Sequence, residues 1–232
     1  MAINKNNQLK AEHTCYTAGT GGGKSVAVQY SGRVPASPHL AIWDPYEDYT
    51  YKQDDPMQQG FAKKKVWHYR TRQAFLKAFT RAWQSQKPFR VAYSPAKPTR
   101  DEFLWFCKVM WTAADGRRRL DVVLEEVARY TETSGKEASI YGELLTGGRK
   151  FGLVVHSVFQ RSTEVPKTTL TQSPYKIIGV QEANIDAKRM AEECDLKIED
   201  IRKLTPLTYI YKKPGWGNTE TLDLTHVFKK AA

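Results

Sequence analysis

The sequence lacks the features that mark secreted and membrane-spanning chains. It has three cysteines in 232 residues, and Cys15, Cys107 and Cys194 are far apart and in no metal-ligand spacing. We therefore expect reduced thiols of a cytosolic protein, not a disulfide framework or a zinc site. No apolar run approaches the ~18 residues needed to cross a bilayer. The polar start, residues 1–8, has no apolar signal-peptide core, so we expect no transmembrane or secretory segment.

Acidic residues are too few to balance the basic ones. The chain contains 36 Lys and Arg against 25 Asp and Glu, which gives a formal net charge of +11. Such an excess bears on partners and solubility rather than on the fold. It predicts a polyanionic partner, with nucleic acid first and ATP or an acidic protein surface as alternatives.

The sequence also lacks repeats and low-complexity segments. Its 232 residues favour one α/β domain with a core of its own. We expect that core to span about residues 12–180, with residues 181–232 forming a C-terminal helix and hairpin appendage.

A glycine-rich run, AGTGGGKS at residues 18–25, matches the phosphate-binding loop (P loop) pattern, with Ala18 where Gly is commoner. Glycines let successive N–H groups turn toward one anion. Lys24 is expected to reach the β and γ phosphates of ATP, and the Ser25 hydroxyl to hold Mg²⁺. The β-prone residues 13–17 and the helix-compatible residues 25–30 give the run its context, whereas a glycine-rich surface turn is the alternative. The predicted nucleotide-binding residues are Gly19, Thr20, Gly21, Gly22, Gly23, Lys24 and Ser25.

Further strands alternate with helices along the chain. Strands are predicted at 40–43, 90–94, 120–126 and 151–158, helices at 72–84 and 99–114, and a hairpin from 209–211 and 221–224. This alternation predicts an α/β fold with a mainly parallel sheet covered on both faces, whose carboxyl edge binds ligands. An apolar stripe on the 99–114 helix predicts core packing rather than base stacking; its members are Phe103, Cys107, Met110, Trp111 and Ala114.

The predicted apolar strand at 120–126 ends in two carboxylates. Glu125 is expected to support Mg²⁺ and Glu126 to act as the general base that activates water, although a solvated acidic strand end is the alternative. Gln160, just past the next strand, is a candidate sensor of the γ-phosphate, whereas His156 within that strand is expected to be a core histidine. Arg149 could act across a subunit boundary or interact with a helix C-terminus.

The ordered motifs resemble the FtsK–HerA superfamily over roughly residues 12–179. The motifs are residues 18–25, LAIWDP at 40–45, VVLEE at 122–126, GRKFG at 148–152 and FQR at 159–161. The resemblance implies a P-loop ATPase core of the additional-strand catalytic-Glu type in a hexameric DNA pump. Because the sequence contains no transmembrane segment or extra domain, it is most similar to the genome-packaging ATPases of tailless, internal-membrane double-stranded DNA viruses.

The resemblance implies ATP and Mg²⁺ as cofactors, and double-stranded DNA and capsid-vertex proteins as partners. It implies a location in the host cytoplasm or at a packaging vertex of the virion. Carried over by position, Glu125 supports the metal, Glu126 activates water, Gln160 senses the γ-phosphate and Arg149 acts in trans.

Other functions and other contacts stay open at this point. The alternatives are a DNA-export or conjugation ATPase, an ATP-binding assembly switch and a nucleotide kinase. DNA contacts are not fixed by the motifs. The candidates are Lys63–Lys65, Arg117–Arg119 at the opposite sheet edge from ATP, and Lys212 and Lys213 near Trp216, each equally compatible with a solvated charge patch.

Overall fold

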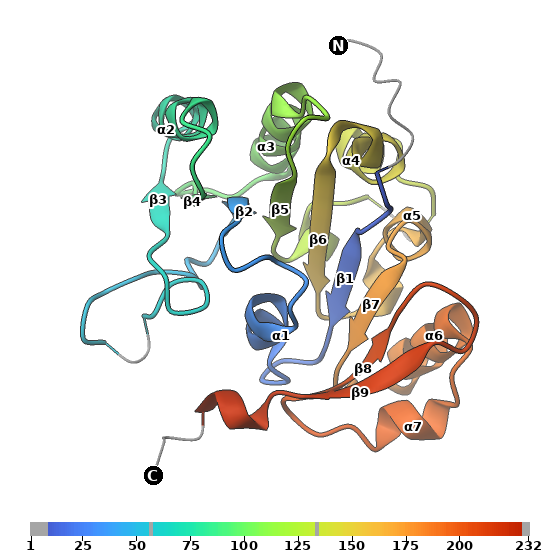
Figure 1. The fold of residues 1–232 in the computed structure, drawn as a ribbon. Coiled ribbons are helices and arrows are strands. Elements are labelled where there is room, and N and C mark those ends of the chain that lie inside the picture. Colours follow the sequence, from blue (N-terminus) through green and yellow to red (C-terminus); the bar gives the residue numbers. More distant parts are fainter. Residues whose placement is uncertain (1–8, 56–57, 133–134, 229–232) are drawn as a thin grey trace.

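A single sheet contains all the strands of the described residues. The computed structural model describes residues 9–55, 58–132 and 135–228, and within them the sheet has nine strands (Figure 1). The strands are β1 (Thr14–Thr17), β2 (His39–Trp43), β3 (Trp67–Tyr69), β4 (Phe89–Tyr93), β5 (Leu120–Leu124), β6 (Leu153–Phe159), β7 (Tyr175–Ile178), β8 (Thr208–Lys212) and β9 (Thr219–Asp223). Their order is β3-β4-β2-β5-β6-β1-β7-β8-β9, parallel from β3 to β7 and antiparallel from there on.

The strand order confirms the predicted fold class. The strand β6 lies between β1, which leads into the P loop, and β5, which leads to the two glutamates, so it is the additional strand of this type of core. The predicted C-terminal hairpin is also present, and β8 and β9 extend the same sheet through β7.

Three of the helices in the described segments begin after a capping side chain. The helices are α1 (Lys24–Tyr30), α2 (Arg72–Gln84), α3 (Arg100–Ala113), α4 (Ile140–Gly147), α5 (Lys167–Thr171), α6 (Asn184–Cys194) and α7 (Ile198–Arg202). The side chains of Thr71, Thr99 and Ser139 accept hydrogen bonds from the first turns of α2, α3 and α4. These caps explain why the predicted helices at 72–84 and 99–114 have nearly the observed bounds.

The two faces of the sheet are covered differently. One face packs against side chains of α2 to α7. The other packs against α1 and against a long loop, residues 44–66, which contributes the buried side chains of Tyr49, Phe61 and Val66. Alternate residues of a strand serve the two faces, with Trp43 of β2 on the first and Ile42 on the second. The loop 44–66 thus covers this face of the sheet together with α1.

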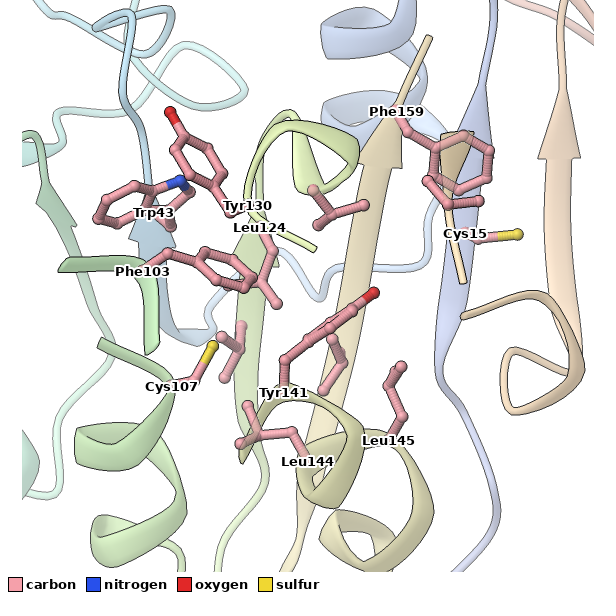
Figure 2. Close-up of a cluster of buried hydrophobic side chains, with 14 of the residues drawn as sticks. Cys15, Trp43, Phe103, Cys107, Leu124, Tyr130, Tyr141, Leu144, Leu145 and Phe159 are labelled. Atoms are coloured by element: carbon pink, nitrogen blue, oxygen red, sulfur yellow. The ribbon is translucent and has the colours of Figure 1, made fainter. Parts of the chain in front are cut away.

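Aromatic packing dominates the first face, as Figure 2 shows. The Trp43 ring lies 5.1 Å from that of Tyr130, which stacks on Phe103 at 5.4 Å between ring centroids. Phe103, Cys107 and Met110 of α3 are fully buried and Ala114 nearly so, while Trp111 is partly buried, which confirms core packing for the stripe. The three cysteines are free and buried.

Two strands are shorter than predicted because the backbone leaves the extended region. Glu126 has a φ of +53°, so the chain turns away directly after β5 and both glutamates lie beyond that strand. Gly152 has a φ of +81° and ends a short 3-10 turn, so β6 begins at Leu153 instead of Phe151. Within the three described segments, no helix has the length and apolar character needed to cross a membrane.

Candidate nucleotide-binding site

The P loop connects β1 to α1 at the carboxyl edge of the sheet. Gly21 and Gly23 have φ values of +76° and +88°, a region that glycine enters without steric cost. A hydrogen bond of 3.0 Å from Gly22 N to Gly19 O closes the turn, and Gly19 N donates to Val180 O at 2.8 Å. The loop therefore has the geometry that a phosphate-binding turn requires.

The C-terminal hairpin, β8 and β9, contacts the P loop through a tyrosine side chain. The Tyr209 hydroxyl of β8 donates to Gly23 O at 2.8 Å and to Gly22 O at 3.3 Å. A side chain at Gly23 would collide with Tyr209 and with Leu207. The sequence of the P loop does not indicate this contact, because Tyr209 lies 186 positions from Gly23.

A cleft of about 520 Å³ opens in front of the P loop. The Lys24 ammonium group donates to Ala18 O at 3.2 Å, within its own loop. Most of the predicted site residues share this cleft, joined by one side chain of α1 and two from the turn after β2. The lining residues are Thr20, Gly21, Gly23, Lys24, Ser25, Val26, Tyr46, Asp48, Glu125, Glu126 and Gln160.

A chain of hydrogen bonds joins the P loop to the predicted base. The Gln160 amide nitrogen donates to Glu126 Oε1 at 3.1 Å. The amide oxygen of Gln160 accepts from the Thr20 hydroxyl, also at 3.1 Å. Glu126 is one of the non-glycine residues with a left-handed backbone, a conformation that clusters at functional sites. The pairing of β6 with both β1 and β5 brings these three residues together.

Glu125 lies deeper in the cleft than Glu126, with 2% of its surface exposed. The Tyr49 hydroxyl donates to its Oε1. The pKa of Glu125 is raised to about 8, chiefly by burial and also by the nearby carboxylates of Asp48, Asp44 and Glu126, while the Tyr49 hydrogen bond acts in the opposite direction. At neutral pH a buried carboxyl with this pKa is mostly protonated, and a nearby cation would stabilise its ionised form.

The turn after β2 delivers side chains that the sequence motifs do not identify. The Asp44 carboxylate accepts from Asp48 N at 2.9 Å and from Tyr49 N at 3.1 Å, and His68 Nε2 lies 2.9 Å from Asp44 Oδ2. These bonds fix Asp48 on the cleft wall and Tyr49 beneath Glu125. The only signal for this turn is the Asp44-Pro45 pair after the predicted strand 40–43.

Arg149 lies at the opposite edge of the sheet. Its guanidinium donates to Leu9 O at 2.6 Å, and it shares a hollow with Gly152 and with Arg117 to Arg119. It does not line the cleft of its own chain, so its predicted action in trans stays a prediction. The placement of the triple arginine at this edge agrees with the expectation from sequence.

His156 is a buried core residue. Its Nε2 lies 2.9 Å from Asp121 Oδ1, and its Nδ1 lies 3.1 Å from the Tyr16 hydroxyl. Burial lowers the pKa of His156, in spite of Asp121.

The side chains of the cleft fit Mg²⁺. Ser25 supplies a hydroxyl, and Glu125, Glu126 and Asp48 supply carboxylate oxygens, the hard ligands that this ion prefers. Among the described residues, no group of three or more His, Cys, Asp and Glu side chains could hold a metal by itself. A Mg²⁺ ion here would be coordinated by these side chains together with phosphate oxygens, which is the usual arrangement for this ion.

Comparison with known proteins gives matches in sequence and in structure. No protein-family model matches the chain. Protein P9 of Pseudoalteromonas phage PM2 is 27% identical over 133 residues, which cover 56% of this chain and 61% of P9, less than two thirds of its length.

Among solved structures, the genome packaging NTPase B204 from Sulfolobus turreted icosahedral virus 2, in complex with AMPPCP, has a TM-score of 0.67. The two proteins are 12% identical over 91% of this chain and 96% of B204. The bacterial conjugative coupling protein TrwB, solved as TrwBdeltaN70, has a TM-score of 0.65 and 14% identity, over 97% of this chain and 86% of the solved chain. The fold predicted together with the sequence motifs is thus confirmed: this chain has the architecture of B204 and TrwB.

Proposed function

We propose that this protein is an ATP-hydrolysing translocase of double-stranded DNA that packages a viral genome into a preformed capsid. The observation that carries the proposal is the Gln160 amide, which bridges Thr20 of the P loop and the Glu126 carboxylate within one cleft. This arrangement suits a water molecule as the acceptor of the γ-phosphoryl group. The fold shared with a genome packaging NTPase supports the biological setting.

The residues of the cleft divide the chemistry among them. Lys24 exchanges the Ala18 carbonyl for the β and γ phosphates of ATP, and the P-loop N–H groups hold the same phosphates. Ser25 and the buried Glu125 would hold Mg²⁺, which would neutralise phosphate charge. Glu126 takes the proton of the attacking water, and Gln160 orients that water against the γ-phosphate.

The remaining expectations concern the assembly. The net charge of +11 suits a polyanionic partner such as DNA. We propose a hexameric ring at a capsid vertex, in the host cytoplasm or on the virion, with DNA in its channel. Arg149, remote from its own cleft, is proposed to act in the cleft of a neighbouring subunit, stabilising the charge on the transferring phosphoryl group.

Three other functions stand as alternatives. A DNA-export or conjugation ATPase is favoured by the fold of the conjugative coupling protein TrwB. An ATP-binding assembly switch would need no general base, and Glu126 in the cleft speaks against it. A kinase would need an acceptor pocket, whereas Gln160 and Glu126 occupy the acceptor side of this cleft.

The test is ATP hydrolysis by the purified protein with and without long double-stranded DNA, beside a Glu126→Gln variant. The proposal predicts turnover that rises with DNA and falls by about 10²- to 10⁴-fold in the variant, with ATP binding retained. ATP binding without turnover in the unmodified protein would favour the switch. Turnover indifferent to DNA would contradict the translocase.

A further inference from the structure

A tight turn in the loop 44–66 presents three consecutive lysines to solvent. Phe61 N donates to Lys64 O at 2.9 Å, and Lys64 N donates back to Phe61 O at 3.0 Å. The two central residues, Ala62 and Lys63, have φ values of +50° and +59°. Two successive non-glycine residues in the left-handed region are strained, and such strain persists only where the surroundings hold it. We call residues 61–65 the basic turn.

The basic turn is held by both halves of the nucleotide site. The Gln29 side chain of α1, the helix that follows the P loop, accepts a hydrogen bond of 2.8 Å from Ala62 N. The Phe61 ring is buried, with 2% of its surface exposed, and its centroid lies 5.3 Å from that of Tyr49. Tyr49 in turn donates to Glu125. Two contacts therefore separate the lysines from the buried carboxyl of the cleft.

The exposed side of the basic turn is cationic and partly aromatic. Lys63, Lys64 and Lys65 are exposed, and none of them forms an ion pair among the residues that the structure describes. The Lys65 ammonium group lies 3.7 Å from the ring centroid of Trp67, which is 55% exposed. Asp54 and Asp55 line a neighbouring hollow with Lys63 and reduce the positive charge there.

Position distinguishes this patch from the other basic clusters. In Figure 1 the loop 44–66 projects from the same edge of the sheet as the P loop and α1. The triple arginine lies at the other edge, where Arg119 pairs with Glu12 and Asp121 and Arg118 stacks on Trp83. Lys212 is committed to the carbonyl groups of its own hairpin turn. The three lysines of the basic turn are therefore exposed cations with a short connection to Glu125, which the other two basic clusters lack.

Consecutive lysines without paired acids suit the phosphates of a nucleic acid backbone, which are contacted by charge and without reading sequence. We propose that the basic turn binds double-stranded DNA phosphates and, through Phe61 and Tyr49, links DNA contact to Glu125. This inference rests on the proposed function and adds to it the surface that contacts DNA. It also explains why a strained turn is built against the hydrogen-bond donor of a buried carboxyl.

The first test is the salt dependence of binding to a fluorescently labelled duplex of about 40 base pairs. A triple variant, K63Q/K64Q/K65Q, is compared with a control of equal charge, K87Q/K188Q/K203Q, which changes exposed lysines elsewhere. Each lost phosphate contact makes the negative slope of log K against log[salt] shallower by about 0.9. We expect the turn variant to lose about 2 to 3 units of slope and at least tenfold in affinity, and the control to match the unmodified protein.

The outcomes separate this inference from the proposed function. An unmodified protein that does not bind duplex DNA would overturn both. An unmodified protein that binds DNA, with the two triple variants equally affected or equally unaffected, would overturn only the role of the basic turn. That second result would leave an acidic protein surface as the partner of the lysines.

The second test addresses the link to Glu125. Phe61→Leu removes the ring that contacts Tyr49, and Phe79→Leu is its control, because Phe79 is equally buried on the other face of the sheet. We expect Phe61→Leu to keep DNA affinity within about twofold while the stimulation of ATP hydrolysis by DNA falls severalfold. Thermal unfolding of both variants shows whether they are folded to the same extent. Full stimulation in the Phe61→Leu variant would overturn the link.

Discussion

The Gln160 side chain at the end of β6 donates to Oε1 of Glu126 beyond β5, over 3.1 Å. The same amide accepts from Thr20, so one side chain connects the P loop to the residue that we propose as the general base. The amide therefore holds Glu126 in position beside the P loop.

Replacing this amide tests its role in turnover. We expect Gln160→Ala to lower kcat for ATP by about 10²-fold, because the amide that holds Glu126 and orients the attacking water is lost, while KM for ATP changes little. Steady-state kinetics check this, with Gln172→Ala as a control on an exposed glutamine at the end of α5. A Gln160→Ala protein with kcat within about twofold of normal would remove Gln160 from the site.

The Tyr49 hydroxyl is the second contact that supports a carboxylate of the cleft. Tyr49→Phe would leave the buried Glu125 without this donor. We expect the free energy of unfolding, measured in urea, to fall by about 1–3 kcal/mol. Tyr30→Phe, at a half-buried tyrosine of α1, is the matched control and should change it little. Equal stabilities for the two variants would contradict the importance of this hydrogen bond.

The Tyr209 hydroxyl connects the C-terminal hairpin to the P loop. Tyr209→Phe removes its hydrogen bonds to the carbonyls of Gly22 and Gly23. We expect ATP affinity, measured by calorimetry, to fall about two- to tenfold, since the loop becomes less ordered before binding. Tyr211→Phe, on the same strand, is the control and should bind ATP normally. Unchanged affinity in Tyr209→Phe would show that the P loop needs no support from the hairpin.

Acid should destabilise the protein through a buried histidine. Burial lowers the pKa of His13 to about 4 from its ordinary 6.5, and its Nδ1 accepts a hydrogen bond from Val155 N. The unfolded chain therefore takes up a proton first, so this stability is present above the unfolded pKa and is lost as pH falls toward the folded pKa. Between about pH 7 and pH 5 the loss is about 2 kcal/mol.

A His13→Asn variant keeps an acceptor but does not titrate, so urea unfolding should weaken less steeply with acid over this range. A residual slope is expected because burial also lowers the pKa of His156. An identical pH dependence in the variant and the unmodified protein would contradict the assignment.

Short sequence motifs predicted most of the residues that line the cleft. The P loop, Glu126 and Gln160 each lie at or just past the end of a predicted strand, and parallel strands bring their carboxyl ends to one edge of the sheet. Trp43 and Phe103 likewise belong to periodic apolar segments, whose burial follows from their spacing.

The rest depends on contacts between distant segments. Tyr49 reaches Glu125 across 76 positions and Tyr209 reaches Gly23 across 186, and neither lies in a motif. The loop 44–66 carries no helical or strand periodicity, although it covers one face of the sheet and supplies Asp48 to the cleft. Such side chains are positioned by tertiary packing, which the local sequence does not encode.

The central claim is that ATP hydrolysis moves this protein along double-stranded DNA. The most direct measurement is displacement of a labelled third strand from a triplex site on a long linear duplex. We predict displacement that requires ATP, fails with a non-hydrolysable analogue and is absent in Glu126→Gln. DNA-stimulated hydrolysis by the unmodified protein without any displacement would contradict the account.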